Sequence, residues 1–201
     1  MITLWGRINS HNVKKVVWAL GEAQVPFERI DMGGKFGYSR QYQALNPNRM
    51  VPAISDGDVH LWESNAILRY LADVHAPQLR ADDPAVRASG DKWMDWQFHF
   101  ADAQRDSFLG VVRHGKDGTD TAVAASARAS EAMMALLDAE LATRDWLSGP
   151  AFGIADMPMG VYAHTYFALG IPRPDLPHLA DWYARLRERP AFAEIAAIPL
   201  T

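Results

Sequence analysis

The chain has 201 residues, of which 49% are hydrophobic and 22% charged, a composition typical of one large or two small globular domains with a sizeable core. The formal net charge is −4 and no stretch gathers enough basic residues to follow a phosphate backbone, so we expect no nucleic-acid partner. The absence of cysteine excludes disulfides, thiolate metal sites and a thiol nucleophile of the protein's own.

The start of the chain carries no apolar stretch of the kind that marks a secretory signal. No later run of about 18 apolar residues predicts a membrane span. None of the seven histidines lies at a recognised metal-ligand spacing, so no metal cofactor is expected. These features predict a cytoplasmic protein that does not bind membranes.

The first elements form a β-α-β unit. Strand-like runs at Ile2–Trp5 and Pro26–Ile30 flank a helix whose apolar residues recur at i, i+3, i+4 and i+7, which predicts one stripe covered by a sheet. That stripe consists of Val13, Val16, Val17 and Leu20. The two strands should be parallel, because a crossover helix joins them.

A hairpin and a helix complete the first part of the chain, after a further helical candidate at Tyr38–Leu45. Runs at Val51–Ser55 and Val59–Trp62 flank Asp-Gly-Asp, in which Gly57 supplies the positive φ of a tight turn, so this strand pair should be antiparallel. A helix should open at Glu63, because apolar residues follow at helical spacing.

The pattern changes to purely helical in the second part. A segment with two prolines and an Asp pair at 77–83 predicts a linker between an α/β domain at 1–76 and an all-helical domain at 84–201. The predicted helices run from about Pro84 to His114, Thr119 to Leu141, Ala155 to Leu169 and Leu176 to Arg187, with a final turn near Ala191 to Ala196.

Ser10 and Asn12 lie between the first strand and the first helix, near a helix N-terminus, where free amides and the helix dipole favour an anion. The structural alternative is simple, because Ser and Asn are favoured N-cap residues in any helix. The spacing of these residues leaves both interpretations open.

The dipeptide Val51-Pro52 also allows two interpretations, a cis or a trans peptide bond, because a proline begins a strand that should be internal to the sheet. A cis peptide bond would turn the Val51 amide and carbonyl outward, where they could pair with an extended peptide ligand. An ordinary trans proline at a strand start is the alternative and the commoner state.

Glu63 and Ser64 enter the helix that follows the hairpin. An acid in a first turn and a serine cap would suffice as structural roles. As a binding site, the hydroxyl and the helix amides suit a carboxylate while Glu63 suits an ammonium, which together match an amino-acid head group.

Four blocks of sequence resemble the cytosolic glutathione transferases. They are S-x-N-V-x-K after the first strand, N-P-N-R-M-V-P-A-I, W-E-S-N-A-I-L-R-Y-L-A, and D-W-Y-A-R-L-R-E-R-P-A-F near the end. The resemblance spans nearly the whole chain and is closest to bacterial theta-, beta- or nu-like members of the serine type. It implies a thioredoxin-like first domain that holds glutathione, an all-α second domain that covers the electrophile, and a homodimer.

The resemblance also implies roles for individual residues. Ser10 stands where theta-like, delta-like and tau-like members have a catalytic serine, whereas Asn12 occupies a place often held by proline and competes for contact with the sulfur. The remaining residues implied in glutathione binding are Val51 and Pro52 at the cysteinyl unit, Glu63 and Ser64 at the γ-glutamyl head group, and Lys35 and Arg49 at the glycyl carboxylate.

The function so implied is ionisation of the glutathione thiol and attack of the thiolate on a small hydrophobic electrophile. Two alternatives share the fold: a glutathione-dependent reductase of disulfides or hydroperoxides, and a binding protein without turnover. A further hypothesis assigns electrostatic steering of the anionic tripeptide to Arg7, Lys14, Lys15 and Lys35.

The site of the second substrate is not defined by the sequence, because its aromatic candidates could equally be core residues. These candidates are Trp93, Trp96, Phe100, Tyr162, His164 and Tyr166. At Gly153 the family pattern implies a Ser or Thr that caps a helix together with Asp156, so this capping box lacks its hydroxyl.

Overall fold

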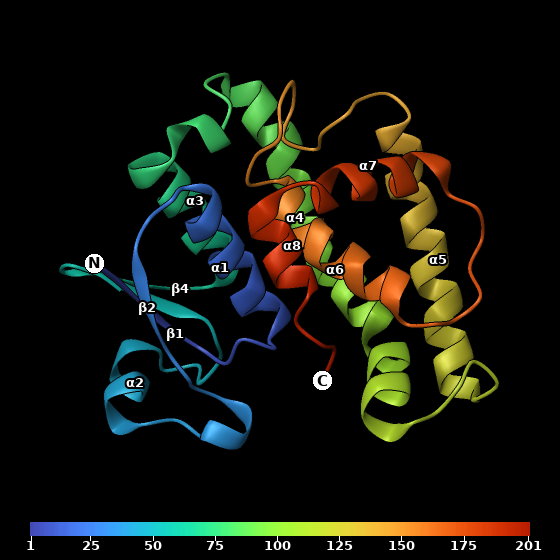
Figure 1. Cartoon of the computed structure of the whole chain (residues 1–201), viewed down its shortest axis with the longest axis horizontal. Coiled ribbons are helices and arrows are strands. Elements are labelled where there is room, and N and C mark those ends of the chain that lie inside the picture. Colours follow the sequence, from blue (N-terminus) through green and yellow to red (C-terminus); the bar gives the residue numbers. More distant parts are fainter. The chain divides into compact units, whose positions relative to one another are not determined.

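The computed structural model describes all 201 residues. The chain divides into two compact units, Met1–Arg80 and Ala81–Thr201. The first unit combines a four-stranded sheet with helices and the second is built from helices alone, as Figure 1 shows. The expected fold class, a thioredoxin-like α/β domain followed by an all-α domain, is confirmed.

The sheet has the strand order β2-β1-β3-β4. Its strands are β1 (Ile2–Trp5), β2 (Phe27–Ile30), β3 (Ala53–Asp56) and β4 (Val59–Trp62). Strand β1 pairs parallel with β2 and antiparallel with β3, and β3 pairs antiparallel with β4, which confirms the β-α-β unit and the hairpin. Gly57 has the expected positive φ of 58° at the hairpin turn.

Three α-helices accompany the sheet: α1 (His11–Glu22), α2 (Arg40–Leu45) and α3 (Ser64–His75). Short 3-10 turns lie at Gly34–Phe36 and Pro77–Leu79. In Figure 1, α1 and α3 lie together on one side of the sheet and α2 lies on the other. Helix α2 begins later than predicted because Ser39 caps it, its Oγ accepting from the Tyr42 amide at 3.1 Å.

Helix α1 is buried on more than the predicted stripe. Val17 is half-buried, whereas Lys14 and Lys15 are only 3% and 0% exposed. The apolar period accounts for the face toward the sheet, but α3 packs against α1 as well and covers residues off that stripe. Lys14 and Lys15 are therefore buried rather than exposed to an incoming ligand, and the steering hypothesis stays a prediction.

The second unit contains five α-helices and one π-helical turn. They are α4 (Pro84–Phe108), the π turn η3 (Leu109–Arg113), α5 (Thr121–Leu141), α6 (Asp156–Ala168), α7 (Pro177–Arg187) and α8 (Pro190–Ala196). Asp83 and Asp120 cap α4 and α5 by accepting bonds from first-turn amides. No helix of the chain combines the length and apolar character that a membrane crossing requires.

The start of α6 is held by a buried carboxylate. Asp156 accepts from the Leu147 amide at 2.8 Å, the Gly153 amide at 3.2 Å and Trp182 Nε1 at 3.0 Å. Complete burial raises the pKa of this carboxyl group, while the N–H donors around it act in the opposite direction. The hydroxyl missing at Gly153 comes from elsewhere, because Ser148 Oγ accepts from the Ala155 amide at 3.0 Å.

Candidate active site

Three segments of the first unit converge beside the N-terminal end of α1. The first is the loop between β1 and α1, and the second is the approach to β3. A Cβ built on Gly6 in that loop would lie 3.3 Å from the Cβ of Val51 and 2.5 Å from Val13 Cγ2. The loop can pass this closely only as glycine, at a φ of 154°. The third segment is the start of α3, which reaches α1 through side chains.

Ser10 occupies the N-cap position of α1, with φ −75° and ψ 128°. Its amide donates to the Arg7 carbonyl at 3.2 Å and its carbonyl accepts from the Lys14 amide at 2.9 Å. Its side chain makes no capping hydrogen bond. The Ser10 hydroxyl therefore does not act as a helix cap, although the backbone of Ser10 occupies the N-cap position.

A chain of hydrogen bonds joins α1 to α3. Lys15 Nζ donates to Ser64 Oγ at 3.3 Å and to Asn65 Oδ1 at 3.4 Å, and Ser64 Oγ donates to Asn12 Oδ1 at 3.3 Å. Ser64 and Asn65 are 2% and 3% exposed. The structure thus brings together two of the predicted site residues, Asn12 and Ser64, from segments about fifty positions apart in the sequence.

The sequence reasoning missed Lys15 and Asn65 as parts of this arrangement. Burial lowers the pKa of Lys15 from 10.5 to about 7, and the nearby charge of Glu63 partly opposes this lowering. Burial also lowers the pKa of Lys14, to about 8. The available signal was the position of both lysines between Val13 and Val16, within an otherwise apolar helix.

The Val51-Pro52 peptide bond is cis, so of the two alternatives that the sequence allowed the structure contains the less common one. Both residues are buried. The loop before them is fixed at the Met50 carbonyl, which accepts from Asn46 Nδ2 at 3.0 Å and from the Tyr42 hydroxyl. Burial raises the pKa of Tyr42 to about 12, so its hydroxyl keeps its proton at neutral pH.

Glu63 occupies the N-cap position of α3 with a φ of 71°, unusual for a residue with a side chain. The interpretation of Ser64 as the cap is therefore wrong, because Ser64 is already the first helical residue. The side chain of Glu63 is exposed and makes no capping bond. Such backbone conformations cost about 1–3 kcal/mol and are concentrated at functional sites.

Lys35 and Arg49 lie apart from the hydrogen-bonded chain. Both are exposed; Lys35 sits on the Gly34–Phe36 turn with its Nζ 5.1 Å from the centre of the Phe36 ring, and Arg49 has a φ of 53°. No hydrogen bond or ion pair brings either of them to Ser10 or Ser64. Elsewhere in the chain, no group of three or more His, Asp or Glu side chains is placed to hold a metal ion.

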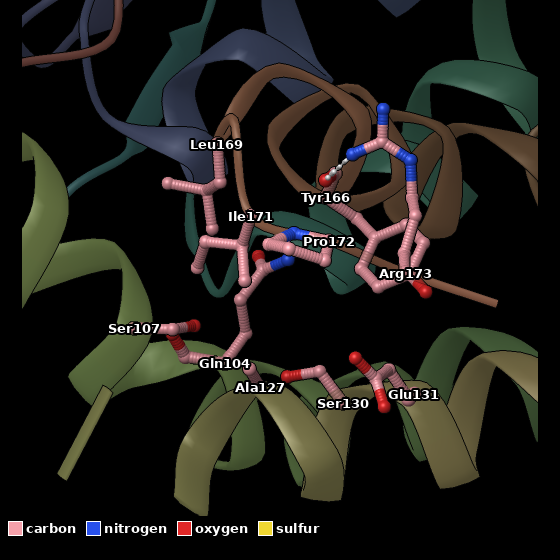
Figure 2. A pocket seen from close by; sticks show the side chains of 10 residues that line it. All are labelled: Gln104, Ser107, Ala127, Ser130, Glu131, Tyr166, Leu169, Ile171, Pro172 and Arg173. Atoms are coloured by element: carbon pink, nitrogen blue, oxygen red, sulfur yellow. Dashed lines mark hydrogen bonds between the residues drawn. The ribbon is translucent and has the colours of Figure 1, made fainter. Parts of the chain in front are cut away.

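The second unit contains a cavity of its own, shown in Figure 2, of about 260 Å³ including its open mouth. Gln104 of α4, Ser130 of α5, Tyr166 of α6 and Arg173 help to line it. The amide nitrogen of Gln104 and the hydroxyl of Tyr166 are buried there without a hydrogen-bond partner in the protein. Tyr166 is thus a cavity residue as well as a core residue.

The other aromatic candidates of the second unit form packing contacts. Trp93 and Trp96 meet edge to face with ring centres 5.1 Å apart, and Phe100 contacts Tyr162 at 6.1 Å. His164 Nδ1 lies 2.8 Å from the Tyr183 hydroxyl. These contacts are those of a helical core.

Two sequence profiles match the chain: that of the glutathione S-transferase N-terminal domain at residues 1–73, and that of the C-terminal domain at residues 96–190. Glutathione S-transferase GstB of Escherichia coli strain K12 is 43% identical over the full length of both chains. Glutathione S-transferase 3 of Zea mays is 31% identical, over 99% of this chain and 95% of its own.

A solved structure shares the fold closely. It is the theta class glutathione S-transferase of Xanthomonas axonopodis pv. citri with glutathione bound, which is 47% identical, with a TM-score of 0.93, over 100% of this chain and 99% of that one. The fold, the site and these relatives define a two-domain transferase class. The chain belongs to the glutathione S-transferase family.

Proposed function

We propose that this protein is a glutathione transferase that binds glutathione in its first unit and transfers the thiolate to a small hydrophobic electrophile. The observation that carries the proposal is the Ser10 hydroxyl, which lies at the N-terminus of α1 without a capping bond of its own. A hydroxyl donor beside free helix amides is suited to stabilise an anionic sulfur.

The energy required is modest. A thiol with a pKa of about 8.5 is roughly 3% ionised at pH 7, and lowering this pKa by about two units makes most of it thiolate at a cost of about 2.7 kcal/mol. One charge-assisted hydrogen bond contributes about 1.5–3 kcal/mol, so Ser10 together with the helix terminus can supply the difference.

The rest of the tripeptide would follow the three segments of the site. The backbone of Val51, next to the cis proline, would pair with the cysteinyl unit. Glu63 would hold the γ-glutamyl ammonium and Ser64 the carboxylate, with Lys35 and Arg49 assigned to the glycyl carboxylate. We also propose that the protein is a homodimer and is located in the cytoplasm. Size-exclusion chromatography with light scattering tests the dimer.

Ser10 is preferred over Asn12 as the activating group because its hydroxyl lies at the N-terminus of α1 and makes no capping bond, so it is available to donate. Ultraviolet titration of bound glutathione tests this. The bound thiol should have a pKa about two units below that of free glutathione, and Ser10→Ala should remove most of the lowering. In the matched variant Asn12→Ala most of the lowering should survive; the reverse pattern would assign activation to Asn12. No lowering in the unmodified protein would refute thiol activation altogether.

An assay of reaction type completes the test. With an activated chloroarene and glutathione, the expected product is the thioether with loss of chloride. A mixed disulfide should yield little oxidised glutathione under the same conditions. Dominant formation of oxidised glutathione would instead establish the reductase, and retention on a glutathione resin without either product would establish a binding protein.

A further inference from the structure

The Lys15 ammonium lies at the junction of the two helices that build the site. It comes from the second turn of α1, is fully buried, and directs two hydrogen bonds to the first two residues of α3. A lysine is almost never fully buried unless its charge is engaged, because removal of an ammonium from water is costly. The position therefore calls for a role beyond packing.

We propose that Lys15 is a positioning residue for glutathione, which anchors Ser64 and Asn65 and through Ser64 braces Asn12 in the first turn of α1. This inference rests on the proposed function, because it assumes that Ser64 receives the γ-glutamyl carboxylate. Lys15 itself touches neither the ligand nor the sulfur in this scheme; it acts through the residues that do.

The hydrogen-bonding capacity of the Ser64 hydroxyl explains how Lys15 holds Ser64 and Asn12 in place. A serine hydroxyl has one hydrogen to donate and lone pairs that accept. Lys15 occupies a lone pair, and the single hydrogen goes to Asn12 Oδ1. A carboxylate arriving at Ser64 must take that hydrogen, so Ser64 turns its hydroxyl away from Asn12 while Lys15 keeps the oxygen in place.

Carboxylate recognition and the thiol end of the site are coupled by this exchange. When the Ser64 hydrogen moves to the ligand, the Asn12 amide is released to make new contacts beside Ser10.

The charge of Lys15 also suits an incoming anion. Burial lowers the pKa of Lys15 to about 7, so a nearby charge can change its protonation in the neutral pH range. A carboxylate next to Ser64 favours the ammonium form, so ligand binding should take up protons. Glu63 at the start of α3 acts on Lys15 through its charge, and His11 and Lys14 are the titratable neighbours of Lys15 along the α1 sequence.

Binding of S-methylglutathione tests the inference, because this ligand has no thiol proton to confuse the measurement. Calorimetry at about pH 8 in two buffers of different ionisation enthalpy gives both affinity and proton uptake. Lys15→Met should weaken binding about tenfold or more and abolish most of the uptake. Lys14→Met, the matched buried lysine, should bind within about twofold of the unmodified protein and keep the uptake.

A double-mutant cycle separates positioning from a general loss of structure. If Lys15 acts through Ser64, the variant carrying both Lys15→Met and Ser64→Ala should bind about as well as the weaker single variant. Additive losses would overturn the inference. Should Lys15→Met fail to fold by circular dichroism, Lys15→Gln retains a donor without a charge and should bind more weakly with the uptake lost; unchanged uptake would overturn the inference.

The two proposals fail in distinguishable ways. An unmodified protein that does not bind S-methylglutathione would refute the proposed function. An unmodified protein that binds it, together with a Lys15→Met variant of equal affinity and equal proton uptake, would refute the role of Lys15 alone.

Discussion

The buried lysines of α1 predict an unusual dependence of stability on pH. Burial lowers the pKa of Lys15 from 10.5 to about 7 in the folded chain, whereas the unfolded chain keeps the ordinary value. At about 1.4 kcal/mol per pH unit, this difference corresponds to about 5 kcal/mol, an upper value for the cost of keeping the ammonium buried.

The sign of the effect follows from proton counting. Below pH 7 both states hold the proton and the whole cost is present. Between about pH 7 and 10.5 the unfolded chain holds more protons than the folded chain, so the free energy of unfolding rises with pH. Above this window both states are neutral and the cost disappears.

Lys15→Met removes this contribution and should change the slope. From about pH 7.5 to about pH 9, the unfolding free energy of the unmodified protein should rise relative to that of Lys15→Met by up to about 1.4 kcal/mol per pH unit. Urea denaturation at several pH values measures it. Lys14→Met is the control, because the pKa of Lys14 is about 8 and its contribution begins at higher pH.

Between about pH 7 and pH 8 the two variants should therefore differ in degree. The unmodified protein should gain more stability relative to Lys15→Met than relative to Lys14→Met, because the pKa of Lys15 is lowered further. Parallel curves for all three proteins through this range would show that Lys15 stays charged while buried, and the reasoning from desolvation would be refuted.

Three further predictions concern the site and its support. Glu63→Gln should raise the KM for glutathione about tenfold with kcat and the melting temperature nearly unchanged, because the side chain is exposed and caps nothing; equal KM values in steady-state kinetics would contradict this. Gly6→Ala should destabilise by about 2 kcal/mol or more in urea, since its Cβ would lie 2.5 Å from Val13 Cγ2; an unchanged denaturation midpoint would show that α1 can shift. Asp156→Ala should cost about 3–5 kcal/mol by leaving Trp182 Nε1 and several amides unpaired, and a loss under about 1 kcal/mol by the same method would mean that water replaces the carboxylate.

The elements of the first unit could be predicted because local rules and tertiary context agree there. Alternating strands, the glycine at the hairpin turn and the apolar period of α1 each point to the observed structure. The isomer of Val51-Pro52 could not be decided in this way. Its cis state depends on how the chain packs around the loop, and a single sequence leaves both isomers open.

The buried polar side chains that support the site and the start of α6 could not be predicted for a different reason. Ser148 supplies the hydroxyl that Gly153 lacks by accepting from the Ala155 amide. Asp156 in turn accepts from the Gly153 amide, and these groups come together only in the folded chain. Lys15 was considered only for electrostatic steering, because lysine side chains are almost never fully buried and the sequence does not indicate that this one is. Burial of the opposite side of α1 follows from the packing of α3, which no periodicity within α1 reveals.

Lys15 also shows why the strained and costly positions of this unit are grouped together. A buried ammonium, a positive φ at Glu63 and a glycine-dependent approach at Gly6 all lie at the segments that converge beside α1. Each costs folding energy and none improves the core. Because such costs persist only where the surrounding structure maintains them, their grouping favours an arrangement kept for binding. A Lys15→Met variant that gains stability near pH 7 while losing affinity for glutathione would show that trade directly.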